Sequence, residues 1–172
     1  MIFFLAGCAL TLTEIAVSGE TKATVEQGTL VEDLVGDLGF SDFVAMDVTA
    51  AEELANQGVE RGDISSAVLT DFGLDAVSGA EDLSFLNSMD VLVATETLPE
   101  LRIAFATAFP AGQANVDFQT TESDILAYVV SQKMTIVTDI NGNRPDSDTV
   151  VRAHWTVTVG VTTQGAVSNL DP

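Results

Sequence analysis

Residues 149–161 carry the clearest pattern in the chain, a strict alternation of two sets of side chains. One set is apolar: Val151, Ala153, Trp155, Val157, Val159 and Val161. The other set is more polar: Val150, Arg152, His154, Thr156, Thr158 and Gly160. Because successive side chains of a strand point to opposite faces, this alternation predicts a strand with one buried and one solvated face. Antiparallel sheets permit such a half-solvated strand.

Shorter segments with strand character recur along the chain. They are residues 11–17, 20–26, 66–75, 89–93, 101–105, 116–118 and 134–138. The first two are predicted to be a pair of strands around a turn at Ser18-Gly19. We expect one face of the third to carry Val68, Thr70, Phe72 and Leu74, and one face of the fifth to carry Leu101, Ile103 and Phe105. Many short strands separated by turn residues favour an antiparallel β-sandwich, which is the predicted fold class.

Two helices are predicted in the N-terminal half. Thr29 followed by Glu32 forms a capping box, and the apolar stripe behind it ends at Gly39. Thr49 followed by Glu52 repeats the box, and Gly58 ends that segment. The sequence therefore predicts an all-β domain with helices near 29–39 and 49–58.

Charge and composition argue against several classes of protein and partner. The chain has 172 residues, with 26 acidic and 6 basic side chains and a net charge of −20. It is nevertheless 47% hydrophobic, which argues against a disordered chain. Six basic residues cannot neutralise a track of phosphates, so nucleic acid is not expected as a partner. The negative charge is also repelled by an anionic membrane surface.

Cys8 is the only cysteine, and it closes the segment Leu5-Ala6-Gly7-Cys8 behind an apolar start. This segment resembles the bacterial lipobox, in which the cysteine is acylated and becomes the mature N-terminus. Ala9 follows it, which by the same resemblance indicates sorting to the outer membrane. A secretory signal has a basic start and about 7–15 apolar residues, and residues 1–7 have neither. Either a longer signal precedes Met1, or Cys8 is a buried free thiol in an ordinary apolar strand.

No catalytic constellation is evident. The only histidine, His154, falls on the outward face of a regular strand and is read as a solvated strand residue. Pairs such as Glu52-Glu53 and Glu81-Asp82 are adjacent in sequence, so their side chains point in different directions. We expect no enzyme activity; the alternative is a small hydrolase that uses acidic residues across a cleft.

The oxygen-rich loop that follows residue 138 is the one weak candidate for a metal site. Calcium prefers several oxygen ligands from a flexible loop. The candidate ligands are Asp139, Asn141, Asn143, Asp146 and Asp148. Gly142 does not match the EF-hand spacing, and an ordinary hairpin loop explains the same residues, so no cofactor is expected. Arg61-Gly62-Asp63 spells an adhesion tripeptide but is read as a turn.

A longer resemblance begins near Gly62 and covers roughly 100 residues. It rests on four segments of the sequence: DISSAVLTDFGLDAV, DLSFLNSMDVLVAT, LPELRIAF and ESDILAYVVSQKMTIVTDINGNRPDSDTVVRAHWTVTV. They resemble a loosely defined group of bacterial lipoproteins of unknown function. The resemblance implies an immunoglobulin-like β-sandwich attached to the cell envelope, and it implies no catalytic residues.

Together these observations give one expectation for the whole chain. Residues 1–7 are the remnant of a signal peptide, and residues 8–172 form a single β-sandwich domain. We expect a non-enzymatic lipoprotein, anchored to the membrane through Cys8, that binds another envelope protein or a surface polymer or serves as a structural module. The alternative is a subunit that self-assembles by pairing its edge strands.

Overall fold

The computed structural model describes residues 11–28, 52–131 and 134–162. The strands are β1 (Thr11–Val25), β2 (Ile64–Ser78), β3 (Leu86–Ala94), β4 (Leu101–Ala106), β5 (Asn115–Asp117), β6 (Gln119–Thr120), β7 (Thr135–Gly142) and β8 (Thr149–Thr162). The helices are α2 (Glu52–Ala55), the 3-10 turn η3 (Arg61–Asp63) and α3 (Leu126–Val129).

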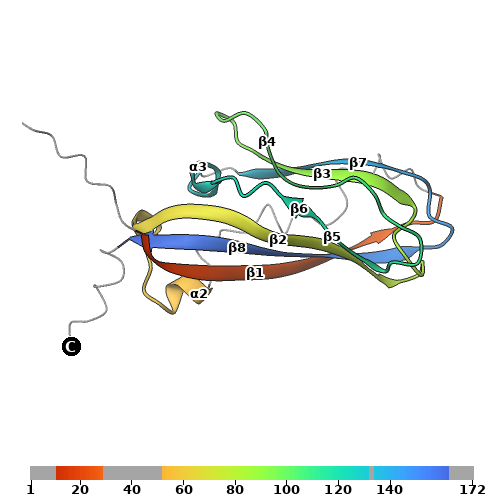
Figure 1. The fold of residues 1–172 in the computed structure, drawn as a ribbon, viewed down its shortest axis with the longest axis horizontal. Coiled ribbons are helices and arrows are strands. Elements are labelled where there is room, and N and C mark those ends of the chain that lie inside the picture. Colours follow the sequence, from red (N-terminus) through yellow and green to blue (C-terminus); the bar gives the residue numbers. More distant parts are fainter. Residues whose placement is uncertain (1–10, 29–51, 132–133, 163–172) are drawn as a thin grey trace, which may run out of the picture.

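Two antiparallel sheets form the layers of a sandwich (Figure 1). Sheet A has the strand order β1-β8-β2-β5, and sheet B has the order β6-β4-β3-β7. Buried apolar side chains from both sheets fill the space between them as one core. The predicted antiparallel β-sandwich is therefore confirmed.

Strand β8 lies in the middle of sheet A, paired with β1 on one side and β2 on the other. Its burial alternates as the sequence predicts: Val157 is 1% exposed, whereas the side chain of His154 is 32% exposed. One face of β8 packs on sheet B, and the other faces solvent, because an antiparallel sheet needs only one covered face.

The predicted turn at Ser18-Gly19 is wrong. β1 runs without a break across both residues, and Gly19 pairs with Trp155 of β8. A Cβ atom at Gly19 would lie 2.1 Å from Cζ2 of Trp155. The glycine therefore leaves room for the buried indole on the neighbouring strand, and it does not mark a change of direction.

Bulges overturn two predicted strand faces. The register of β2 against β8 shifts between Leu69 and Asp71, so Phe72 and Leu74 point inward while Val68 and Thr70 point outward. The register of β3 against β4 also shifts. Phe105 consequently lies on the outer face, with the guanidinium of Arg102 4.5 Å from its ring centroid. An extra residue in one strand reverses the side-chain alternation beyond it.

The chain changes sheets at Phe118. β5 pairs with β2 in sheet A, and β6 pairs with β4 in sheet B. Phe118 lies between the two strands, is 8% exposed, and makes edge-to-face contacts with Phe72 at 4.9 Å and Phe109 at 5.9 Å. This aromatic cluster fixes the crossing between the two layers.

The helical segments are short. α2 falls within the segment predicted near 49–58, and its Leu54 is fully buried. The helix predicted near 29–39 lies outside the described residues. α3 was not predicted; the hydroxyl of its Tyr128 donates a hydrogen bond to the Pro99 carbonyl at 2.9 Å. In the part of the chain that the structure describes, no helix has the length and apolar character needed to span a membrane.

Candidate functional site

Hydrogen bonds tie together the loops at one end of the sandwich, on the right in Figure 1. The backbone N–H of Gln27 donates to the Asp148 carboxylate at 2.7 Å, and its side-chain amide donates to the Asp146 carbonyl at 2.7 Å. At the same end of sheet B, beside the pairing of Leu86 with Gly142, the N–H of Asn143 donates to the Phe85 carbonyl at 2.6 Å. The end of β1, the β2–β3 loop and the β7–β8 loop are therefore held in one arrangement.

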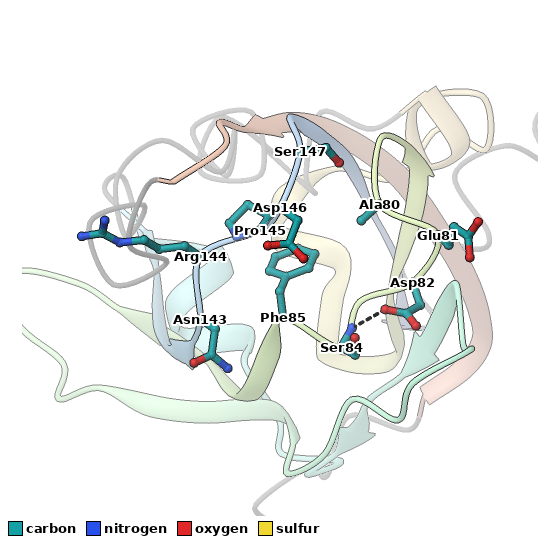
Figure 2. Close-up of a pocket in the computed structure, with 10 residues that line it drawn as sticks. All are labelled: Ala80, Glu81, Asp82, Ser84, Phe85, Asn143, Arg144, Pro145, Asp146 and Ser147. Carbon is teal, nitrogen blue, oxygen red and sulfur yellow. Dashed lines mark hydrogen bonds between the residues drawn. The ribbon is translucent and has the colours of Figure 1, made fainter.

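A pocket of about 510 Å³, which we call the end pocket, opens between the β2–β3 and β7–β8 loops (Figure 2). It is lined by Ala80, Glu81, Asp82, Ser84, Phe85, Asn143, Arg144, Pro145, Asp146 and Ser147. Phe85 is 8% exposed, and Pro145 is also buried. The end pocket thus combines two buried apolar residues with a polar and charged rim.

Asp82 lies in the lining and also supports the loop. Its Oδ2 accepts a hydrogen bond from the backbone N–H of Gly112 at 2.6 Å, and its Oδ1 accepts one from the N–H of Ser84 at 2.9 Å (Figure 2). The bond from Gly112, with the contribution of Ser84, lowers the pKa of Asp82 below its ordinary value. Asp82 therefore carries its negative charge at neutral pH while joining the β2–β3 loop to the β4–β5 connection.

The remaining charged residues of the end pocket are three. Glu81 and Asp146 are exposed on its rim, from opposite loops. Arg144 and Glu81 both project away from the other lining residues in Figure 2, on opposite sides of the end pocket. With Asp82, the lining holds three carboxylates and one guanidinium, so its electrostatic potential favours cations.

The five predicted calcium ligands are divided among different places. Asn143 and Asp146 line the end pocket. Asp139 and Asn141 are exposed on β7, where Oδ1 of Asn141 accepts a hydrogen bond from the Asn87 amide at 2.9 Å. Within residues 11–28, 52–131 and 134–162, no three His, Cys, Asp or Glu side chains are grouped so that they could hold a metal ion. The loop was only a weak candidate for calcium, and the expectation that the protein holds no cofactor stays a prediction.

A second polar site, which we call the outer-face cluster, lies on the solvent side of sheet A. Arg152 donates through Nε at 2.9 Å and Nη2 at 2.8 Å to Oδ2 of Asp75, and its Nη1 is 3.5 Å from Glu20. The hydrogen bond with Asp75 raises the pKa of Arg152 further above its ordinary value. His154 lies between two carboxylates, with Nδ1 3.3 Å from Asp75 and Nε2 3.9 Å from Asp71.

The sequence pattern predicted only part of the outer-face cluster. The alternation in residues 149–161 places Arg152 and His154 together on the outward face, as found. Asp71 and Asp75 join them because β2 pairs beside β8, opposing Thr156 and Arg152. These side chains meet because β2 and β8 are neighbours and pair in this register, and a local sequence pattern predicts neither the neighbours nor the register. The cluster is a set of ion pairs, with no arrangement typical of a catalytic triad.

Two acidic residues from distant segments lie opposite each other on neighbouring strands. Asp90 of β3 pairs directly opposite Asp139 of β7. Like charges in this position are destabilising, and Arg102 offsets the repulsion by approaching Asp90 to 3.5 Å. The pair lies on the outer face of sheet B, which is not a cleft of the kind that glycoside hydrolysis needs.

The tripeptide at residues 61–63 and the single cysteine were also singled out in the sequence. Arg61-Gly62-Asp63 forms the turn η3, where Oδ2 of Asp63 accepts a hydrogen bond from the Glu60 N–H at 3.0 Å. The expected structural turn is thus confirmed. Cys8 lies outside the described residues, so its predicted acylation stays a prediction.

Comparisons with known proteins add no relative. No protein-family model, no curated protein and no solved structure matches this chain.

Proposed function

We propose that this chain is an exported lipoprotein of the bacterial cell envelope, anchored through Cys8 and acting as a non-enzymatic binding or structural module. The observation that carries the proposal is the lipobox-like segment directly before the sandwich. Cys8 lies three residues before Thr11, where β1 begins. An acyl chain buries its methylene groups in lipid at about 0.8 kcal/mol each, and two or more chains make the anchoring stable.

The fold indicates which end of the sandwich such an anchor would hold near the membrane. β1 begins at the left end of the sandwich in Figure 1, whereas the end pocket lies between loops at the right end. A lipid attached three residues before β1 therefore leaves the end pocket pointing away from the membrane. This arrangement suits a module that presents its loops to another envelope protein or a surface polymer, with the outer membrane as the proposed location.

Binding fits the described polar groups better than catalysis. Asp82 accepts two backbone hydrogen bonds, and Asp75 accepts hydrogen bonds from Arg152 and lies 3.3 Å from Nδ1 of His154. These groups join strands and loops, and a hydrolase would need a carboxyl group free to exchange protons with a substrate.

Metabolic labelling tests the anchor. Cells that carry the native gene are grown with radioactive palmitate, and we expect label in the protein and a detergent-soluble membrane fraction. Cys8→Ser should abolish the label, whereas the neighbouring Ala9→Ser should keep it. An inhibitor of lipoprotein signal peptidase should cause a larger precursor to accumulate. Equal labelling of both variants contradicts the proposal.

Self-assembly through edge strands is a second candidate function, favoured by β1. This strand has 15 residues and, among the described residues, pairs only with β8. Two copies of β1 paired antiparallel about Thr21 would place Glu20 of each copy opposite Lys22 of the other. Sedimentation velocity at increasing salt tests this candidate. Screening of the −20 charge should then promote association, and a monomer at every salt concentration rejects it.

A further inference from the structure

The second half of β1 is an open edge of sheet A. Every second residue of an edge strand directs its backbone N–H and C=O groups away from the sheet, where another strand can pair with them. Among the described residues β1 pairs only with β8, and this pairing is regular from Thr13 to Val25. α2 lies against β1 near its start, at the left in Figure 1. Residues 17–25 are therefore the part of the edge to which a further strand can be added.

The charges on this part of β1 are not balanced within the molecule. Glu20 and Lys22 are both exposed on the outer face of sheet A. Oε2 of Glu20 is 3.5 Å from Nη1 of Arg152. Lys22 lies directly opposite the same Arg152 on β8, and like charges in that position are destabilising. In the part of the chain that the structure describes, no ion pair includes Lys22, so a partner that brings a carboxylate beside it would offset this repulsion.

A second copy of the chain supplies that carboxylate in one antiparallel register. When two β1 strands pair about Thr21, Glu20 of each copy lies opposite Lys22 of the other, and residues 17–25 of the two copies are opposed. A shift of the partner by two residues places Glu20 opposite Glu20 in one direction and Lys22 opposite Lys22 in the other. Both of those pairs are repulsive. A shift by one residue brings the inner face of one strand beside the outer face of the other. The pattern of charges and faces therefore favours the register centred on Thr21.

We propose that two copies of this chain pair through β1 in the register centred on Thr21, and that Lys22 of each copy completes the outer-face cluster of the other. The cluster then runs from Asp75 through Arg152 and Glu20 to Lys22 of the second copy. This inference rests on self-assembly, the second candidate function, and names its interface and its charge pairs. The net charge of −20 on each copy opposes the contact, so association should strengthen as salt screens the repulsion.

Sedimentation velocity of the full chain at increasing salt tests the charge pairs. Glu20→Lys places lysines opposite each other and should weaken dimerisation by roughly four- to thirtyfold, because two attractive pairs become repulsive. Glu100→Lys, at an exposed residue before β4, makes the same change in net charge. It should keep or strengthen dimerisation, since it lowers the overall repulsion. Glu20→Lys/Lys22→Glu restores pairs of opposite charge and should recover most of the affinity. Circular dichroism confirms that each variant is folded.

Cysteine pairs test the register independently of the charges. In a Cys8→Ser background, Ser18→Cys/Thr24→Cys places two cysteines opposite each other across the interface. Opposed residues of antiparallel strands have their Cα atoms about 4.5–5.5 Å apart, which a disulfide can span. Mild oxidation should therefore trap this variant as a covalent dimer. Ala16→Cys/Thr24→Cys, also at exposed positions, displaces one cysteine by two residues and should form little covalent dimer.

Three results would overturn the interface: a monomer at every salt concentration, equal dimerisation of Glu20→Lys and Glu100→Lys, or equal trapping of the two cysteine pairs. A dimer that Glu20→Lys leaves unchanged rejects this interface while self-assembly remains a candidate function. Because these measurements need no lipid, their failure leaves the anchor at Cys8 to be judged by labelling. Failure of the labelling experiment likewise leaves the measured dimerisation intact.

Discussion

Replacing Gly19 with alanine tests the packing of β1 on β8 at its tightest point. The new Cβ would lie 2.1 Å from Cζ2 of Trp155 and 2.6 Å from Cε2, whereas carbon atoms in contact are about 3.5–4.0 Å apart. Trp155 is 7% exposed, so its indole cannot turn away into solvent. Overpacking of this kind costs about 1–3 kcal/mol, and the gain from replacing a glycine in a strand offsets about 0.5–1 kcal/mol of it. We expect Gly19→Ala to lower the free energy of unfolding by about 0.5–2 kcal/mol.

Gly73→Ala is the matched control on the other face of the same sheet. Its Cβ would lie 2.5 Å from Cε1 and Nε2 of His154, but this ring is on the outer face with 32% of its side chain exposed. The imidazole can rotate, and the contacts with Asp71 and Asp75 that it then loses at this partly exposed site are worth about 0–1 kcal/mol. We therefore expect a change within about 0.5 kcal/mol, since the glycine replacement offsets that loss.

Equilibrium unfolding in urea measures both variants, with circular dichroism and the emission of the single tryptophan, Trp155, as probes. Adding Trp155→Phe to Gly19→Ala should relieve the overlap, so the double variant should lose less stability than the sum of the two single variants. Variants that carry Trp155→Phe lack the tryptophan and are followed by circular dichroism alone. If Gly19→Ala and Gly73→Ala are equally stable, or if the double variant is additive, the stacking of Trp155 on Gly19 is refuted.

Two other predictions concern the core and the loop end. Phe118→Ala removes the aromatic side chain at the change of sheets and should cost about 3–5 kcal/mol in urea unfolding; a loss below about 1 kcal/mol would contradict its place among Phe72 and Phe109. Asp82 has a lowered pKa in the folded state, mainly through the Gly112 N–H, so it stabilises the fold above its unfolded pKa and this contribution is lost as the pH falls below about 4 through the folded value. Asp82→Asn should therefore be less stable than wild type at pH 7 and should lose less stability on acidification, and parallel melting curves at pH 7 and pH 3 test this.

The local sequence pattern predicted a strand and its faces correctly where one face is buried and the other is solvated. Residues 149–161 satisfy this condition, and β8 has the predicted faces and nearly the predicted limits. The all-β antiparallel sandwich followed from the recurrence of such segments. A strand that is buried on one face alternates apolar and polar residues, so its buried positions can be predicted from the sequence.

Local pattern failed where the cause lies on another strand. Gly19 was predicted in a turn because glycine favours turns, but the close approach of Trp155, 136 positions away, requires it. The bulges in β2 and at the β3–β4 pairing reverse the faces of Val68 and Phe105, and no turn residue marks them. The change of sheets at Phe118 likewise depends on two partners, β2 and β4.

The candidate site was the least predictable part. The loop after β7 stood out for its oxygen atoms, yet half of the end pocket comes from residues 80–85, about 60 positions earlier. Asp82 offered one signal, an aspartate two residues before Ser84 in a loop, which is typical of a side chain that accepts a backbone hydrogen bond. The outer-face cluster depends on the register between β2 and β8, which sequence pattern does not specify.

The mass of the N-terminal peptide of the native protein, purified from its own cells in detergent, tests the proposed lipid anchor most directly. A lipid anchor at Cys8 requires a mature chain that begins at Cys8 and carries acyl chains on that residue, with residues 1–7 removed. A peptide that retains Met1 and an unmodified Cys8 thiol would contradict it.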